Sequence, residues 1–155
     1  MITVEGSLVF DPVNVSKKHH AQSSWKKVAM VKLDGDMDAY YAWFLQKRFN
    51  LTLNPPMRGA HVTIISDKID PLIYDQAFAV FNGKPISLAY DPEEIRTNGQ
   101  HWWLKVHSVD SQNIRRAMGL TPDPFFSLHL TLGYANDKNM AHSRYILDCI
   151  TRHGL

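Results

Sequence analysis

Hydrophobic and polar positions alternate over several short runs of the chain, and segments with helical spacing lie between these runs. Alternation over a short run predicts a half-buried β-strand, whereas apolar positions three and four residues apart predict an amphipathic helix. The predicted strands cover residues 2–10, 26–33, 60–65, 85–90, 101–107 and 127–134. The predicted helices run from Asp36 to near Arg48, from Asp70 to about Phe81, from Asp110 to a break at Gly119 and Pro122, and over about 139–152.

This order of elements mixes short strands with single helices, which predicts an α+β fold with mostly antiparallel strand pairing. The 155 residues suit one domain over positions 1–155, and no linker or low-complexity segment divides them. With 45% hydrophobic and 21% charged residues, the composition is ordinary for a soluble globular protein. A polar loop is expected over residues 13–24.

Charge and cysteine content narrow the possible partners. A formal net charge of +2 is too small to indicate a duplex-DNA footprint, but it is compatible with a small anionic substrate. The single cysteine, Cys149, excludes an intramolecular disulfide and favours a reducing, cytoplasmic setting. The first residues lack the pattern of a signal peptide, and no stretch is long enough to span a bilayer. We therefore expect a cytoplasmic protein with no membrane partner.

A repeated His-x-Thr motif carries the candidate chemistry. It occurs as His61-Val62-Thr63-Ile64 and, nearly half a chain later, as His129-Leu130-Thr131-Leu132, each time after a helix and a proline-containing loop. Residues two positions apart on a strand point to the same side, roughly 6.6 Å apart. In the second strand we expect the apolar face, which includes Tyr134, to pack in the core. In the first strand Ile65 shares the face of His61, so that strand is expected to run into the core at its end.

Two imidazoles and two hydroxyls around one space suit phosphodiester cleavage. A neutral histidine can accept a proton from the attacking oxygen while a protonated one donates to the leaving oxygen. Threonine hydroxyls can donate hydrogen bonds to the phosphate oxygens, and the arrangement requires no metal or other cofactor. The predicted catalytic residues are His61, Thr63, His129 and Thr131. The alternative is that each histidine is a satisfied core residue of its strand, but two matched motifs favour catalysis.

The two motifs resemble the signature of the 2H phosphoesterase superfamily, also called LigT-like phosphodiesterases. More narrowly, the stretches 56–63, 97–104 and 124–133 are similar to bacteriophage anti-CBASS phosphodiesterases, which degrade cyclic oligonucleotide immune signals such as cGAMP. The resemblance implies a bilobal fold with pseudo-twofold symmetry, in which two antiparallel sheets face a central groove and helices lie outside. It also implies attack by a ribose 2′-hydroxyl on the adjacent 3′-phosphate of a cyclic di- or trinucleotide, in the host cytoplasm.

Five further residues are candidates for substrate binding. Trp103 could stack on a base and Lys105 could hold a phosphate, because both lie on one face of the strand 101–107. Tyr90 and Phe10 are weaker stacking candidates, and Arg58 could help to hold an anion. For each of them the alternative is an ordinary structural role, as a packed aromatic or a solvated charge.

The segment Lys17-Lys18-His19-His20 could cover a bound phosphate, although a solvated charged loop is the simpler interpretation. Its histidine pair lacks the partners of a metal site. Two other functions stay open at this point. One keeps the chemistry but acts on RNA ends, on a 2′,3′-cyclic phosphate or a 2′,5′-linked oligoadenylate. The other is a non-catalytic nucleotide- or RNA-binding module, which would have no need of two facing imidazoles.

Overall fold

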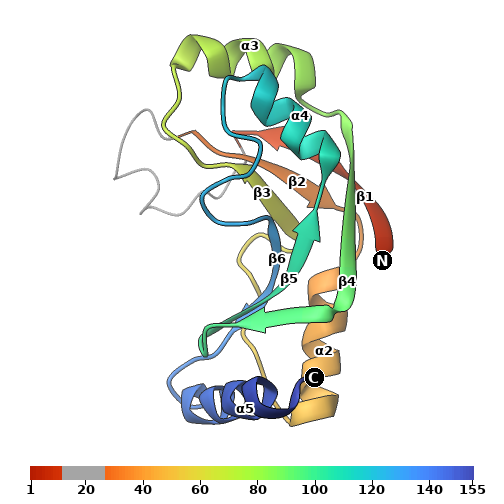
Figure 1. Cartoon of the computed structure of the whole chain (residues 1–155), viewed down its shortest axis with the longest axis vertical. Coiled ribbons are helices and arrows are strands. Elements are labelled where there is room, and N and C mark those ends of the chain that lie inside the picture. The colour runs from red at the N-terminus through yellow and green to blue at the C-terminus, as the bar shows by residue number, and fades with distance from the viewer. Residues whose placement is uncertain (12–26) are drawn as a thin grey trace.

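The computed structural model describes residues 1–11 and 27–155, so the predicted loop over residues 13–24, with Lys17, Lys18, His19 and His20, lies outside the described residues. This part of the chain contains six strands and four helices, and Figure 1 shows how they are arranged. The elements are β1 (Ile2–Phe10), β2 (Ala29–Leu33), α2 (Met37–Phe49), β3 (His61–Ile65), α3 (Pro71–Phe81), β4 (Pro85–Thr97), β5 (His101–His107), α4 (Val109–Ala117), β6 (His129–Tyr134) and α5 (Met140–His153). The predicted order and the mixed α and β class are confirmed.

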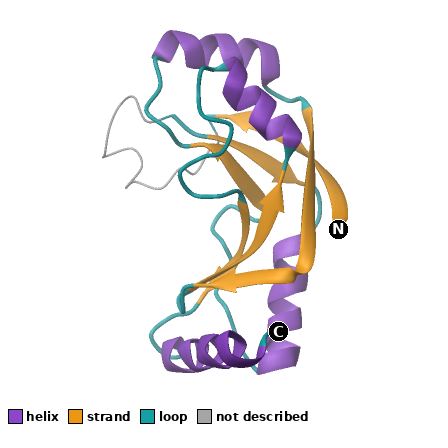
Figure 2. Ribbon diagram, in the orientation of Figure 1, coloured by secondary structure: helices purple, strands orange, loops and turns teal. Residues whose placement is uncertain are grey.

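All six strands belong to one antiparallel sheet that closes into a barrel in the order β1-β2-β3-β6-β5-β4. The resemblance implied two sheets, whereas here β4 joins both halves by pairing with β1 and with β5. Helices α3 and α4 gather at one end of the molecule and α2 and α5 at the other (Figures 1 and 2). The two strands that carry the His-x-Thr motifs, β3 and β6, are hydrogen-bonded neighbours in this barrel.

Several predicted boundaries differ from the structure, among them the start of the predicted strand 26–33, which begins at Ala29. The predicted strand 85–90 continues to Thr97, because pairing with β5 resumes at Ile95 after an irregularity that begins at Tyr90. Helix α4 is capped by Ser108, which accepts a hydrogen bond from the Ser111 amide, and not by Asp110. Asp70 caps α3 as predicted, since its side chain accepts from Leu72 N. Ser127 and Leu128, the first two residues of the predicted strand 127–134, are not part of β6.

One face of the sheet forms the hydrophobic core. Its side chains include Leu8, Val31, Val62, Leu88, Leu104 and Leu130, all of them fully buried. Burial of each such side chain contributes about 1.5–3 kcal/mol to the free energy of unfolding, relative to leaving it exposed. The core also takes in Trp102, whose Nε1 donates a hydrogen bond to Ser143 of α5 at 2.8 Å and so ties that helix to β5. Among the described helices, none is both long enough and apolar enough to cross a bilayer.

Both motif strands contain a β-bulge immediately after the threonine. In β3, Thr63 pairs with Met30 and Ile65 with Ala29, so Ile64 is the extra residue, and Ile64 and Ile65 are both buried. The predicted entry of this strand into the core is therefore confirmed. In β6, Thr131 pairs with Trp103 and Gly133 with Trp102, so the alternation reverses. The predicted core position of Tyr134 is consequently wrong, and this side chain is 40% exposed.

Candidate active site

The two His-x-Thr motifs lie side by side and pair through their central residues. Val62 of β3 is opposite Leu130 of β6 in an antiparallel register. In that register His61 is next to Thr131 and Thr63 is next to His129. Val62 and Leu130 are buried in the core, whereas the four flanking residues are half-buried on the other face. The structure thus brings together the four residues that the sequence predicts to be catalytic.

The register also sets how far apart the two histidines stand on the sheet. His61 and His129 are diagonal neighbours across the pair, and the Cα atoms of such positions are about 7–8 Å apart in an antiparallel sheet. A tetrahedral phosphorus with attacking and leaving oxygens on opposite sides can fit between two groups at this spacing. Direct contact between the rings is not required, because each ring serves a different oxygen of the phosphodiester.

Both histidines are held by their own chain in the same way. His61 Nδ1 lies 2.8 Å from Gly59 O, and His129 Nδ1 lies 2.8 Å from Ser127 O. A carbonyl oxygen can only accept, so Nδ1 donates in both rings. Nε2 is then the atom that gains or loses a proton. Each ring therefore presents to the open face a single nitrogen that is fit for acid or base work.

The surroundings of His61 favour its neutral form. Burial lowers the pKa of His61 most strongly, and the charges of Arg58 and His129 lower it further. The hydrogen bond to Gly59 O and the carboxylate of Asp38, a buried residue in the first turn of α2, act in the opposite direction without outweighing burial. A histidine with a lowered pKa is unprotonated at neutral pH, which is the state that a general base needs.

Strand β5 adds an aromatic and a cationic side chain to the same face. Trp103 pairs with Thr131, and Lys105 pairs with His129, so both side chains lie beside the motif of β6. The Trp103 ring packs edge-on to the His129 ring, with centroids 6.3 Å apart. On the other side, Lys32 of β2 pairs with His61 and is exposed. The fold thus places Trp103 and Lys105, the predicted base-stacking and phosphate-binding residues, beside the motif of β6.

A pocket of about 270 Å³ opens over β5 and β6. Its lining is Asn98, His101, Trp103, Phe126, Ser127, His129 and Thr131. A second pocket, of about 580 Å³, shares Ser127 with the first and includes Lys105 and Phe125. His61 and Thr63 are not among the described residues that line either pocket. The open space therefore extends from His129 over β5 and under the loop that leads into β6.

Phe125 and Phe126, in the loop before β6, were not singled out from the sequence. They are 95% and 72% exposed, and their rings pack edge-to-face with centroids 5.0 Å apart. Each lines a different one of the two pockets. The sequence does contain a signal for them: two adjacent aromatic residues stand in a loop that lacks the strand or helix periodicity by which they could be assigned to the core. Exposed aromatic rings at the rim of a pocket are suited to stacking on a planar ligand.

The other predicted binding residues have different positions. Phe10 and Tyr90 are buried in the core, where Phe10 packs against Tyr74, and Tyr90 lies 3.2 Å from the hydroxyl of Tyr41. Neither ring is accessible to a base, so the packing alternative accounts for both and we remove them from the site. Arg58 is half-buried two residues beyond Pro56, and burial lowers its pKa. Its charge acts on His61, which keeps it in the site.

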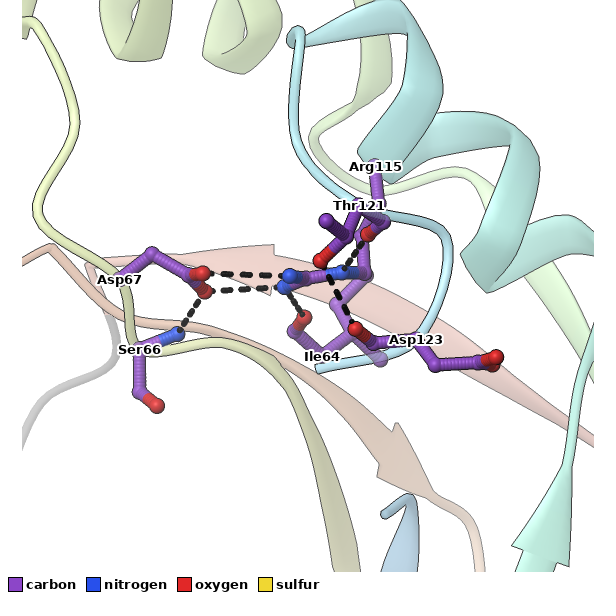
Figure 3. A network of polar contacts seen from close by, with 6 residues as sticks. All are labelled: Ile64, Ser66, Asp67, Arg115, Thr121 and Asp123. Carbon is purple, nitrogen blue, oxygen red and sulfur yellow. Dashed lines mark hydrogen bonds and ion pairs between the residues drawn. The ribbon is translucent and has the colours of Figure 1, made fainter. Parts of the chain in front are cut away.

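A buried polar network lies next to the site and was also missed from the sequence. Arg115 of α4 is fully buried and forms an ion pair with Asp67, with one oxygen of the carboxylate 2.9 Å from Nη1 and the other 3.1 Å from Nη2 (Figure 3). In sequence, Arg115 stands in the polar stretch of an amphipathic helix, where an arginine is ordinarily solvated. Its burial follows from the way α4 packs against the end of β3.

Comparisons of the chain with protein-family models, with curated proteins and with solved structures found no match. Within residues 1–11 and 27–155, no three histidine, cysteine or carboxylate side chains are grouped so as to hold a metal ion. The candidate site is therefore defined by its geometry: two histidines with equivalent backbone ties, two threonines beside them, and an aromatic pocket next to the second motif.

Proposed function

We propose that this protein is a metal-independent phosphodiesterase of the 2H type. The observation that carries the proposal is the equivalence of the two motifs. They pair through Val62 and Leu130, each histidine donates from Nδ1 to the carbonyl two residues earlier, and each threonine is followed by a bulge. Two histidines with a purely structural role would have no reason to share all three features on a half-exposed face. A shared catalytic role explains why the two motifs are equivalent.

The proposed first step is attack by a ribose 2′-hydroxyl on the adjacent phosphorus. Nε2 of His61 accepts the proton of that hydroxyl, in keeping with the lowered pKa of this ring. Nε2–H of His129 donates a proton to the 5′-oxygen as its bond to phosphorus breaks. The products are a 2′,3′-cyclic phosphate and a free 5′-hydroxyl. In the second step water attacks the same phosphorus, His129 Nε2 accepts a proton of that water, and His61 Nε2–H donates a proton to the 2′-oxygen as its bond to phosphorus breaks, which leaves a 3′-phosphate.

The two threonines complete the site. Thr63 and Thr131 lie beside the histidines of the opposite strands, so their hydroxyls can donate to the non-bridging phosphate oxygens. Those oxygens gain charge in the transition state, and donors already in place stabilise them without reorganisation. Lys105, opposite His129, adds a positive charge on the same side. The proposed fold is the two-lobed 2H arrangement with pseudo-twofold symmetry, supported by the separation of the helices into two pairs at opposite ends.

The substrate that we propose is a cyclic di- or trinucleotide of the kind used as an immune signal, cleaved at its 3′–5′ links in the cytoplasm of a phage-infected cell. Two adjoining pockets with Trp103, Phe125 and Phe126 at their rims support a ligand with more than one base. The second candidate is an RNA end bearing a 2′,3′-cyclic phosphate or a 2′,5′ link, which would need the first pocket alone.

The test is incubation of the purified protein with a panel of cyclic di- and trinucleotides, 2′,5′-linked oligoadenylates and RNA ends, with the products resolved by chromatography. We expect cleavage of at least one cyclic oligonucleotide in EDTA, with a 2′,3′-cyclic phosphate as the early product. A substrate that lacks the 2′-hydroxyl at the scissile link should resist. Its cleavage at an unchanged rate would contradict 2′-hydroxyl attack, and binding without turnover of any substrate would favour a non-catalytic module.

A further inference from the structure

Arg115 contacts the chain on either side of the candidate site. Its Nη1 donates to Ile64 O at 2.9 Å, directly after the first motif, and its Nε donates to Thr121 O at 2.7 Å, in the loop before the second (Figure 3). Nη1 and Nη2 also donate to the two oxygens of the Asp67 carboxylate. Its fork-shaped guanidinium, with donors in a fixed plane, thus joins the segment 64–67, about fifty residues earlier in the chain, to the loop that follows α4.

The Ile64 carbonyl needs a partner because of the bulge in β3. Ile64 is the residue skipped where the pairing with β2 shifts register, and the pairing with β6 is at Val62. A buried carbonyl that is left without a hydrogen bond destabilises the folded chain. Arg115 Nη1 supplies the missing hydrogen bond to the Ile64 carbonyl, which lies one residue after Thr63. The bulge that follows the first motif is therefore stabilised from α4.

The contact at Thr121 acts on the second motif. Thr121 Oγ1 donates to Asp123 O at 2.9 Å, which closes the turn at the start of the loop. The same loop continues to Phe126 and Ser127, which line the pocket, and the Ser127 carbonyl accepts the hydrogen bond from His129 Nδ1. A displacement of the loop would thus move both the pocket wall and the group that orients His129.

We infer that Arg115 is a positioning residue that holds the loop of the second motif in a set relation to the end of the first. This inference rests on the proposed function. A buried ion pair often contributes no more stability than a well-packed apolar pair of the same volume, so stability alone does not explain an arginine here. The guanidinium of Arg115 does explain the arginine, because this group binds two backbone carbonyls and one carboxylate, and an apolar side chain could bind none of them.

The experiment is a double-mutant cycle in the phosphodiesterase assay that uses wild type, Arg115→Lys, His129→Ala and the double variant. Lysine keeps the charge but cannot reach three partners at once. We expect Arg115→Lys to lower kcat by about tenfold or more with little change in KM, since small misplacement of reacting groups is costly. In the His129→Ala background we expect less than about a twofold further loss, because there is no longer a second histidine to position.

A second variant and a second measurement guard against simple unfolding. Asp67→Asn removes the charge of the partner but keeps its shape, and we expect a smaller loss of the same kind. In both variants, amide hydrogen exchange of residues 121–128 should rise by about tenfold while that of β4 and β5 stays unchanged. Arg116→Lys is the matched control, because Arg116 is the next residue, exposed, and bonded to Asn113 of its own helix.

The outcomes separate the two proposals. Equal losses from Arg115→Lys in both backgrounds would show a general structural role and overturn the inference, as would unchanged exchange in residues 121–128. If wild type and His129→Ala were equally active, or both inactive on every substrate, the proposed function would fall and the positioning role with it. If His129→Ala lost activity while Arg115→Lys kept the wild-type kcat, the proposed function would stand and only the positioning role of Arg115 would be refuted.

Discussion

Val62 and Leu130 face each other across β3 and β6, and each is the central residue of a His-x-Thr motif. This one pairing places the histidine of either motif beside the threonine of the other. It also directs both apolar central residues into the core, so that the four polar side chains share the opposite face.

Replacing either histidine with alanine should abolish most of the turnover. Each of His61 and His129 supplies one of two proton transfers, and the loss of such a group costs about 10²–10⁴-fold in rate. Both side chains are half-buried on the open face, so the thermal midpoint should change little. The measurement is kcat on the best substrate of the panel, with and without EDTA. His153→Ala, in the exposed last turn of α5, is the control; near-normal activity in His61→Ala would rule out the mechanism.

The pH dependence should be bell-shaped, with an acid limb governed by His61. Because burial and the Arg58 charge lower the pKa of His61, it should lie below the ordinary value of about 6.5. Arg58→Gln removes a positive charge, so the pKa of His61 should rise and the acid limb of kcat/KM should move to higher pH. Asp38→Asn removes a negative charge and should move it to lower pH. Titration of the His61 Cε1 proton by NMR measures both shifts; shifts of the same sign in the two variants would contradict this account.

Each threonine hydroxyl should contribute to the transition state more than to substrate binding. Thr63→Val and Thr131→Val keep the β-branched shape that suits a strand and remove only the donor. We expect kcat to fall by about 10²-fold, as for other donors to a developing oxyanion, while KM changes little. Thr3→Val, on an exposed position of β1, serves as the reference for the substitution itself. A change confined to KM would assign the hydroxyls to ground-state binding.

Trp103 should act on substrate binding, because it lines the pocket beside His129 and pairs with Thr131. Stacking of a base on an aromatic ring contributes about 1–3 kcal/mol. Trp103→Ala should therefore raise KM by about tenfold or more on a nucleotide substrate. Trp43→Ala, which removes a 54% exposed ring from α2, should leave KM unchanged. Equal KM values for wild type and Trp103→Ala would mean that the ring only packs against its strand neighbours.

The bulge after Thr131 should be sensitive to a single added methyl group. A Cβ at Gly133 would lie 2.6 Å from Asn54 O and 2.8 Å from Leu53 Cβ, because the chain at 53–54 crosses directly over it. Gly133→Ala should lower the free energy of unfolding by about 1–3 kcal/mol beyond any backbone strain. Gly35→Ala is the comparison, since Gly35 has φ +91° but open space around it. Urea denaturation measures both, and equal losses would argue against the close contact.

The sequence alone determined the element order, the antiparallel character and the four motif residues. Alternation along 127–134 separated Leu128 and Leu130 from His129 and Thr131, because side chains on a strand must point to opposite sides in turn. Local pattern was misleading where the backbone departed from that rule. The bulge at 131–133 reversed the alternation, so Tyr134 became exposed although the pattern placed it in the core.

The tertiary structure decided which strands are neighbours, and with it the composition of the site. Sequence position made Phe10 and Tyr90 weaker stacking candidates than Trp103, but only barrel closure decided that the first two are buried and that the third lies beside His129. Burial of Arg115 likewise depends on contacts with Ile64 and Asp67, far away in the chain. Periodicity reports the face on which a side chain lies, whereas the partner of that face is set by pairing and packing between distant segments.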